Sequence, residues 1–279
     1  MWIHYYRVSK TFVVAVFRGV MKHNTGGRAS AISYFIFSAM IPMLILMIYG
    51  ASFLVPEPTV EHLIDRLLKS YVPQMPEESL VPATIRRLAM LHSAIRIIGI
   101  LGFLWTTIGG FVLLQQIVDE IWEVHHRRSF WRQYLVGFVM LAILLAVTVV
   151  ASIFTAISPA LISGVGQLLQ LPWLGLLHFV AGLSLPVILF VTCFFIYRVL
   201  PSHTPKLLPT LVGAMFATVA IYVSRGVFMI YTHHLGNYQI IYGALTFVML
   251  LTFWIYIVSI ILLLGVEVTA AIEHIRESR

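Results

Sequence analysis

The run Tyr242–Val266, YGALTFVMLLTFWIYIVSIILLLGV, decides the fold of this chain. None of its residues is Asp, Glu, Lys or Arg. About 20 mainly apolar residues are enough to cross the hydrocarbon core of a membrane as a helix. The strands of a membrane barrel alternate apolar and polar residues instead. The run therefore predicts a transmembrane helix.

Similar runs and the overall composition extend this prediction to the whole chain. Sixty per cent of the 279 residues are hydrophobic, only 10% are charged, and the mean hydropathy is +0.95. A soluble protein carries about 25% charged residues, so a soluble enzyme, a disordered chain and a coiled coil are excluded. We predict one all-α membrane domain over residues 1–279. Its other five transmembrane helices are expected at Ala29–Val55, Ile95–Ile117, Tyr134–Ile157, Pro172–Tyr197 and Leu207–Ile230.

The distribution of Lys and Arg predicts the orientation in the membrane. Most of them lie before the first run, between the second and third, between the fourth and fifth, and after the sixth. The connections between the third and fourth runs and between the fifth and sixth contain none. Because cytoplasmic loops carry an excess of Lys and Arg, we expect both termini in the cytoplasm. An even number of spans agrees with this.

The segment 1–28 predicts an amphipathic helix that lies on the inner leaflet. Arg7, Lys10, Arg18 and Lys22 fall on one arc of a helical wheel, where anionic lipid would attract them. The same cations interrupt every apolar stretch that could serve as a signal peptide. The alternative is a cytoplasmic helix that docks on the bundle.

The two remaining segments outside the spans are an extracytoplasmic loop and a cytoplasmic tail. The loop, residues 56–94, shows apolar residues at helical spacing, and prolines divide it into two expected amphipathic helices. These helices either cap the bundle or shield an entrance between spans. The tail comprises residues 267–279.

A search for catalytic machinery predicts no enzyme. The sequence contains no phosphate-binding glycine loop, no H-E-x-x-H and no serine elbow. The single cysteine, Cys193, excludes an intramolecular disulfide and a cysteine-based metal site. Adjacent residues on a helix point in different directions, so His125 and His126 do not form a chelating pair. We therefore expect no catalytic residues, no metal and no cofactor.

Ionisable residues at membrane depth are the better candidates for function, because they are costly there and usually face a cavity or a partner. Arg225 lies about five residues before the outer end of its span, or roughly 7–8 Å below that boundary. It either binds an anionic group or extends its side chain outward to water. Two other candidates, Arg96 and His178, are cationic or can become so, and lie in the outer half of the membrane. A separate acidic group at the inner ends of the second and sixth spans consists of Asp119, Glu120 and Glu267.

This arrangement suits an anionic amphiphile or a proton path, although scattered residues that reach for water would look the same. Membrane lipids are the expected partners, and nucleic acid is not; the oligomeric state stays open. A second group of residues predicts either a gate or helix packing. Tyr238 and Tyr242 share one helix face, Gly243 permits close backbone approach, and Pro42 favours a kink.

Several motifs together resemble the YihY/BrkB family of bacterial inner-membrane proteins. The matching stretches cover nearly the whole chain in the family's order. They are Ala31–Leu44 (AISYFIFSAMIPML), Trp105–Trp122 (WTTIGGFVLLQQIVDEIW), Tyr197–Pro201 (YRVLP), Gly213–Ala214, Tyr238–Gly243 (YQIIYG), Trp254–Tyr256 and Leu264–Glu267 (LGVE). Asp119 departs from the pattern, because many relatives carry Asn near this position.

The resemblance implies a six-span protein of the bacterial inner membrane with cytoplasmic termini. It also implies transport or export of an anionic or amphipathic compound such as a lipid. The alternative is a non-transporting scaffold or envelope-assembly factor. The family has carried a ribonuclease name, but this chain offers no carboxylate or histidine cluster that would hold divalent ions in water.

Overall fold

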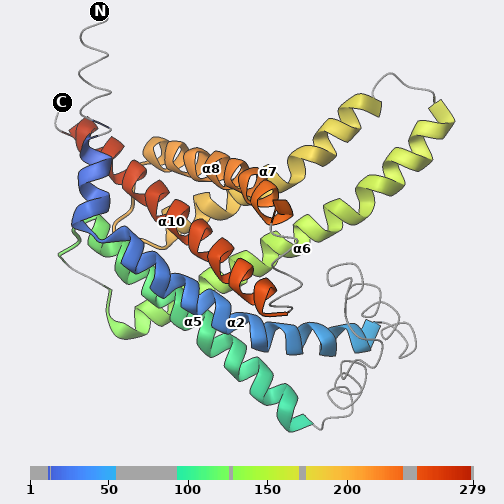
Figure 1. The fold of residues 1–279 in the computed structure, drawn as a ribbon, viewed down its shortest axis with the longest axis horizontal. Coiled ribbons are helices and arrows are strands. Elements are labelled where there is room, and N and C mark those ends of the chain that lie inside the picture. The colour runs from blue at the N-terminus through green and yellow to red at the C-terminus, as the bar shows by residue number, and fades with distance from the viewer. Residues whose placement is uncertain are drawn as a thin grey trace, which may run out of the picture. The chain divides into compact units, whose positions relative to one another are not determined.

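The computed structural model describes residues 12, 14–54, 93–125, 128–169, 174–234 and 244–277. Every regular element among these residues is a helix, which confirms the all-α prediction (Figure 1). Residues 14–22 are helical. The long helices that follow are α2 (Thr25–Leu54), α5 (Ser93–Ile121), α6 (Phe130–Leu169), α7 (Leu174–Val199), α8 (Leu207–His234) and α10 (Ala244–Glu277).

Two residues with a left-handed backbone conformation follow the ends of helices, one before α2 and one after α5. Asn24 has a φ of 46° between the helix of residues 14–22 and α2, and asparagine tolerates this region well. Glu123 has a φ of 52° two residues after the end of α5. The amide of Val124 donates back to the carbonyl of Asp119 at 2.9 Å, which closes the end of α5.

The described residues of each predicted transmembrane run lie on one of the long helices. Within the described residues, four stretches are long and apolar enough to cross a membrane, and Leu185–Val199 is a shorter apolar one. The four are Ile97–Ile121, Phe130–Val150, Leu207–Thr232 and Leu245–Arg276. The chain is therefore a membrane protein, while the count of six spans stays a prediction. Most of the loop 56–94, and residues 1–11 and 13 of the N-terminal segment, lie outside the described residues.

The chain divides into two compact units, one formed by Met1–Tyr34 with Ile108–Arg279 and the other by Phe35–Thr107. In the smaller unit, Pro42 lies inside α2 next to Gly102 of α5. A Cβ atom on Gly102 would lie 3.7 Å from the proline ring, which is ordinary contact. The bend-prone residue Pro42 therefore sits where the two helices pack.

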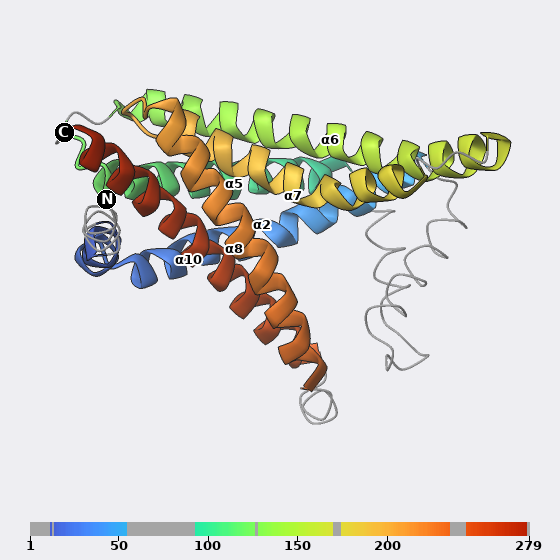
Figure 2. The same ribbon diagram turned by 90° about the horizontal axis from the view of Figure 1, so that it is seen from above.

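In the larger unit, α8 packs between α7 and α10, and α6 packs along α7 (Figures 1 and 2). Its buried apolar residues gather where α2, α6 and α8 begin and where α5, α7 and α10 end. In the predicted six-span topology consecutive spans alternate in direction, which would place these ends on one side of the membrane. We call this region the packed end; the cation distribution predicts that it is cytoplasmic. The described part of α6 and the other halves of α8 and α10 expose many large apolar side chains, as lipid-facing surfaces do.

Candidate functional site

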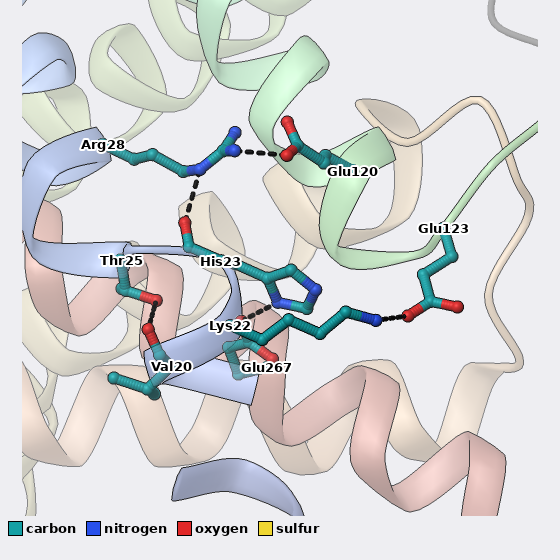
Figure 3. Close-up of polar contacts among 8 residues, drawn as sticks. All are labelled: Val20, Lys22, His23, Thr25, Arg28, Glu120, Glu123 and Glu267. Carbon is teal, nitrogen blue, oxygen red and sulfur yellow. Dashed lines mark hydrogen bonds and ion pairs between the residues drawn. The ribbon is translucent and has the colours of Figure 1, made fainter. Parts of the chain in front are cut away.

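The packed end contains a set of buried polar side chains, which is unusual inside an apolar bundle. Burial of a polar group is costly unless it is hydrogen-bonded, so these groups need specific partners. Part of this network is drawn in Figure 3. The buried polar residues of the larger unit are His23, Thr25, Ser33, Gln115, Asp119, Thr210, Thr218, Ser259, Glu267, Thr269 and Glu273.

Asp119 holds the connection between α7 and α8. Its two carboxylate oxygens accept the backbone N–H of Ser202 at 2.7 Å and the Ser202 hydroxyl at 2.6 Å. The same hydroxyl accepts a longer hydrogen bond, 3.4 Å, from the amide of Gln115, one turn earlier on α5. Because Asp119 is only 1% exposed, these hydrogen bonds replace the water that the carboxylate loses.

Arg128 supports the same connection from the segment between α5 and α6. Its guanidinium donates to the carbonyl oxygens of Leu200 at 3.0 Å and Pro201 at 2.7 Å. Burial lowers the pKa of Arg128, and the negative charge of Asp119 opposes that change. The arginine therefore lies close to Asp119, and together they fix the backbone of residues 200–202.

Two ion pairs join the start of the chain to α5 and α10 (Figure 3). His23 Nδ1 lies 2.7 Å from Glu267 Oε1, and both side chains are almost fully buried. Arg28 pairs with Glu120 and also donates to the backbone carbonyl of His23. The segment around Asn24 is thus attached to two helices far away in the sequence.

A third ion pair, Lys22 with Glu123, is exposed to solvent. The hydrogen bond from Lys22, and then its positive charge, hold the pKa of Glu123 below its ordinary value. The lowered pKa means that this pair stabilises the fold above the ordinary pKa of the carboxyl. The contribution is lost as the pH falls through the lowered value. Because both side chains are exposed, water and salt keep the effect small.

Glu273 of α10 supports the start of α8. Its carboxylate accepts the backbone N–H of Lys206 at 3.0 Å, just before the first residue of α8. The other oxygen lies 3.4 Å from the ring nitrogen of His203. The first amides of a helix lack partners within the helix and favour negative charge. Glu273 thus acts as a cap supplied by a neighbouring helix.

Glycines allow the helices of the packed end to approach closely. A Cβ atom on Gly265 would collide with the hydroxyl of Tyr197, which donates to the carbonyl of Leu262 at 2.8 Å. A Cβ atom on Gly213 would collide with Thr269 and would lie 2.7 Å from the carbonyl oxygen of Gly265. Motif residues from YRVLP, GA and LGVE therefore meet in one place, although they are far apart in the sequence.

The structure brings the three predicted acidic residues to this one region. Asp119, Glu120 and Glu267 each have a partner, and the partners are Ser202, Arg28 and His23. Sequence analysis missed these partners and Glu273. An acidic residue in an apolar helix signals that a partner exists, but no spacing in the sequence identifies it.

The other predicted site residues fall elsewhere or outside the described part of the chain. Arg225 lies on α8 with an exposed side chain. Arg96 and His178 lie on α5 and α7, but their side chains are outside the description. Tyr238, Tyr242 and Gly243 are not among the described residues. The predicted gate and anion-binding roles thus stay predictions.

The chemistry available at the packed end is proton exchange and hydrogen bonding. Among the described residues, no three His, Cys, Asp or Glu side chains are grouped to hold a metal ion. The ring atom Nε2 of His23 and the amide oxygen of Gln115 are buried with no hydrogen-bond partner in the described part of the structure. The imidazole nitrogen can take up a proton, whereas the amide oxygen can only accept a hydrogen bond.

Comparison with known proteins places the chain in a family. The family model described as Virulence factor BrkB matches residues 16–279. A UPF0761 membrane protein of Coxiella burnetii is 27% identical, with 98% of this chain and 97% of the relative covered. The UPF0761 membrane protein VP0125 of Vibrio parahaemolyticus is also 27% identical, with 94% and 84% covered.

A Bacillus subtilis protein named as ribonuclease-like, YfkH, is 22% identical over 94% of this chain and 95% of its own length. No solved structure matches. The family match covers nearly all of the sequence and contains every motif on which the resemblance was based. The chain belongs to the Virulence factor BrkB family, the YihY/BrkB family of membrane proteins.

Proposed function

We propose that this protein is a bacterial inner-membrane transporter or exporter of an anionic or amphipathic compound, lipids included, with both termini in the cytoplasm. The observation that supports it is the position of Arg225. This residue lies on the apolar helix α8 within the candidate span Leu207–Thr232. Its side chain is exposed on the half of α8 that is not part of the packed end.

The depth of Arg225 favours a bound anion over a simple extension to water. The span ends at Thr232, seven residues later, which corresponds to roughly 10 Å at the helical rise. The surface around Arg225 is open: a Cβ atom on Gly226 would meet no heavy atom within 4 Å, and Tyr222 is exposed. A negative partner would stabilise a guanidinium at this depth, and its planar fork suits a phosphate or carboxylate.

Reconstituted protein tests this proposal. Vesicles would contain a fluorescent anionic phospholipid, phosphatidylglycerol, or its zwitterionic counterpart, phosphatidylcholine, and movement between leaflets would be measured. We expect the protein to move the anionic lipid faster. Arg225→Gln should slow this movement about tenfold or more, because hydrogen bonds to charged groups contribute about 1.5–3 kcal/mol. Arg225→Lys, which keeps the charge but loses the fork, should be intermediate.

Arg276→Gln is the matched control, because Arg276 is an exposed cation in the last turn of α10. It should transport at the normal rate. Full activity of both Arg225 variants at normal abundance would remove Arg225 from the substrate site. If folded protein speeds the movement of neither lipid between leaflets, transport of this class of compound is contradicted.

The second candidate is a scaffold or envelope-assembly role without transport. It is favoured by the packed end, where hydrogen bonds with Asp119, Arg128 and Glu273 hold the connection between α7 and α8 in place. If vesicles show no lipid movement, and Arg225→Gln still restores the envelope of a deletion strain, the scaffold role is preferred. In both cases we propose a protein that is not an enzyme.

A further inference from the structure

His23 and Glu267 form a closed pocket for one carboxylate and one imidazole. Their side chains are 9% and 5% exposed, and Nδ1 lies 2.7 Å from Oε1. Gly19, one turn before His23, covers the carboxylate: a Cβ atom there would collide with Oε2 and lie 3.0 Å from the carboxyl carbon. The absence of a side chain at position 19 is what lets the helix of residues 14–22 lie directly on Glu267.

The number of protons held by this pair determines its charge. With no added proton, a neutral imidazole faces a buried carboxylate, and the pair carries one negative charge. With one proton the pair is neutral overall, either as an ion pair or as two uncharged groups. With two protons, a charged imidazole faces a neutral carboxyl, and one positive charge is buried. A buried net charge is costly, so the state with one proton fits this pocket best.

The charged groups around the pair balance one another, so they do not offset a net charge on it. From its own helix the pair faces Lys22, which is exposed and neutralised by Glu123 after α5. Arg28 of α2 is paired with Glu120 of α5. On α10, His274 is exposed. Two neighbouring positive charges are therefore balanced by two negative ones, and the net charge of the pocket is set by His23 and Glu267.

We infer that the His23–Glu267 pair is a proton-binding site, and that its single proton holds the helix of residues 14–22 against α10. Nε2 of His23, which has no hydrogen-bond partner in the described part of the chain, is the atom at which the first proton enters or leaves. The second proton goes to the Glu267 carboxylate, because both ring nitrogens of the charged imidazole already carry one. Either gain or loss of a proton charges the pocket and weakens the docking. The docked fraction should therefore be highest at intermediate pH and fall on both sides.

Distances between two spin labels test this in the full-length protein in lipid nanodiscs. The labels are attached at Met21→Cys, whose native side chain is 70% exposed, and at Ser129→Cys, also exposed, in a Cys193→Ala background. Between about pH 4 and pH 10 the docked population should follow a bell-shaped curve. Beyond each limb, the docking constant should fall about tenfold per pH unit, as expected for one proton.

Each single variant should keep one limb of the bell-shaped curve and lose the other. Glu267→Gln leaves only the imidazole to titrate, so docking should fall at acid pH and persist at alkaline pH. His23→Gln leaves only the carboxyl, so docking should persist at acid pH and fall at alkaline pH. In the double variant, docking should not depend on pH. His203→Gln, which alters the separate contact with Glu273, should keep the complete bell.

Three outcomes would overturn the inference. In the first, the label distances of the unaltered pair do not depend on pH. In the second, the bell is unchanged in both single variants, which would assign the titration to other groups. In the third, a variant is undocked at every pH although the protein is folded, which would make the pair a plain structural contact.

Discussion

Gly213 and Gly226 lie on the same helix, α8, but in opposite environments. Gly213 is buried where α8 crosses α10, and no side chain fits between it and the carbonyl of Gly265. Gly226 is exposed, with open space where a Cβ atom would lie. A side chain at position 213 would therefore collide with α10. A side chain at position 226 would affect only the helix propensity of α8.

This contrast gives a matched pair of substitutions. Gly213→Ala should destabilise the protein by about 1–3 kcal/mol, because overpacking forces two helices apart. Gly226→Ala should be neutral or stabilise by up to about 1 kcal/mol, since alanine favours a helix. Thermal unfolding of both variants in the same detergent measures the difference. Equal stability of the two variants would contradict the close approach of α8 and α10.

At the scale of elements, α8 depends on a residue of another helix for its first turn. Glu273 of α10 accepts the N–H of Lys206, so the start of α8 and the end of α10 form one unit. We expect Glu273→Ala to destabilise the protein by about 0.5–2 kcal/mol, because the first turn of α8 loses the acceptor that caps it. Glu273→Gln should cost less, because the amide oxygen still accepts. Denaturant titration of the two variants tests this order, and a larger loss in the glutamine variant would refute the capping role.

The existence of these helices could be predicted from sequence, but not where they end. The prediction Leu207–Ile230 agrees with the start of α8 at Leu207. The prediction Tyr242–Val266 stopped at the first charge, whereas α10 continues to Glu277. Hydropathy reports which residues avoid water, while a helix continues as long as its backbone hydrogen bonds form. Glu267 is therefore a residue of α10 within the packed end.

The partners of the candidate site could not be predicted, because they depend on contacts between distant parts of the chain. Asp119, Glu120 and Glu267 were identified from the cost of burying a charge. Their partners lie on connections and on the segment around His23, where the sequence pattern is the same as in any polar turn. Only the packing of α2, α5 and α10 brings them together.

At the scale of the whole molecule, the orientation in the membrane is open to a direct test. A membrane-impermeant maleimide should modify Glu77→Cys, in the loop outside the described residues, on intact spheroplasts. It should modify Ser129→Cys, exposed between α5 and α6, only after permeabilisation. Cys193 is buried and should contribute little background, which Cys193→Ala verifies. The reverse labelling pattern would place the termini outside the cell.

The packed end also has a consequence for how the protein is made. His23 and Glu267 are 244 positions apart, and Lys206 and Glu273 are 67 apart. While a ribosome is still synthesising α10, the earlier helices hold an imidazole, a helix start and the Gly213 surface without their final partners. Closure of this end therefore requires α10, and we expect a chain shortened to end before α10 to leave these polar groups unpaired and to be degraded faster in cells.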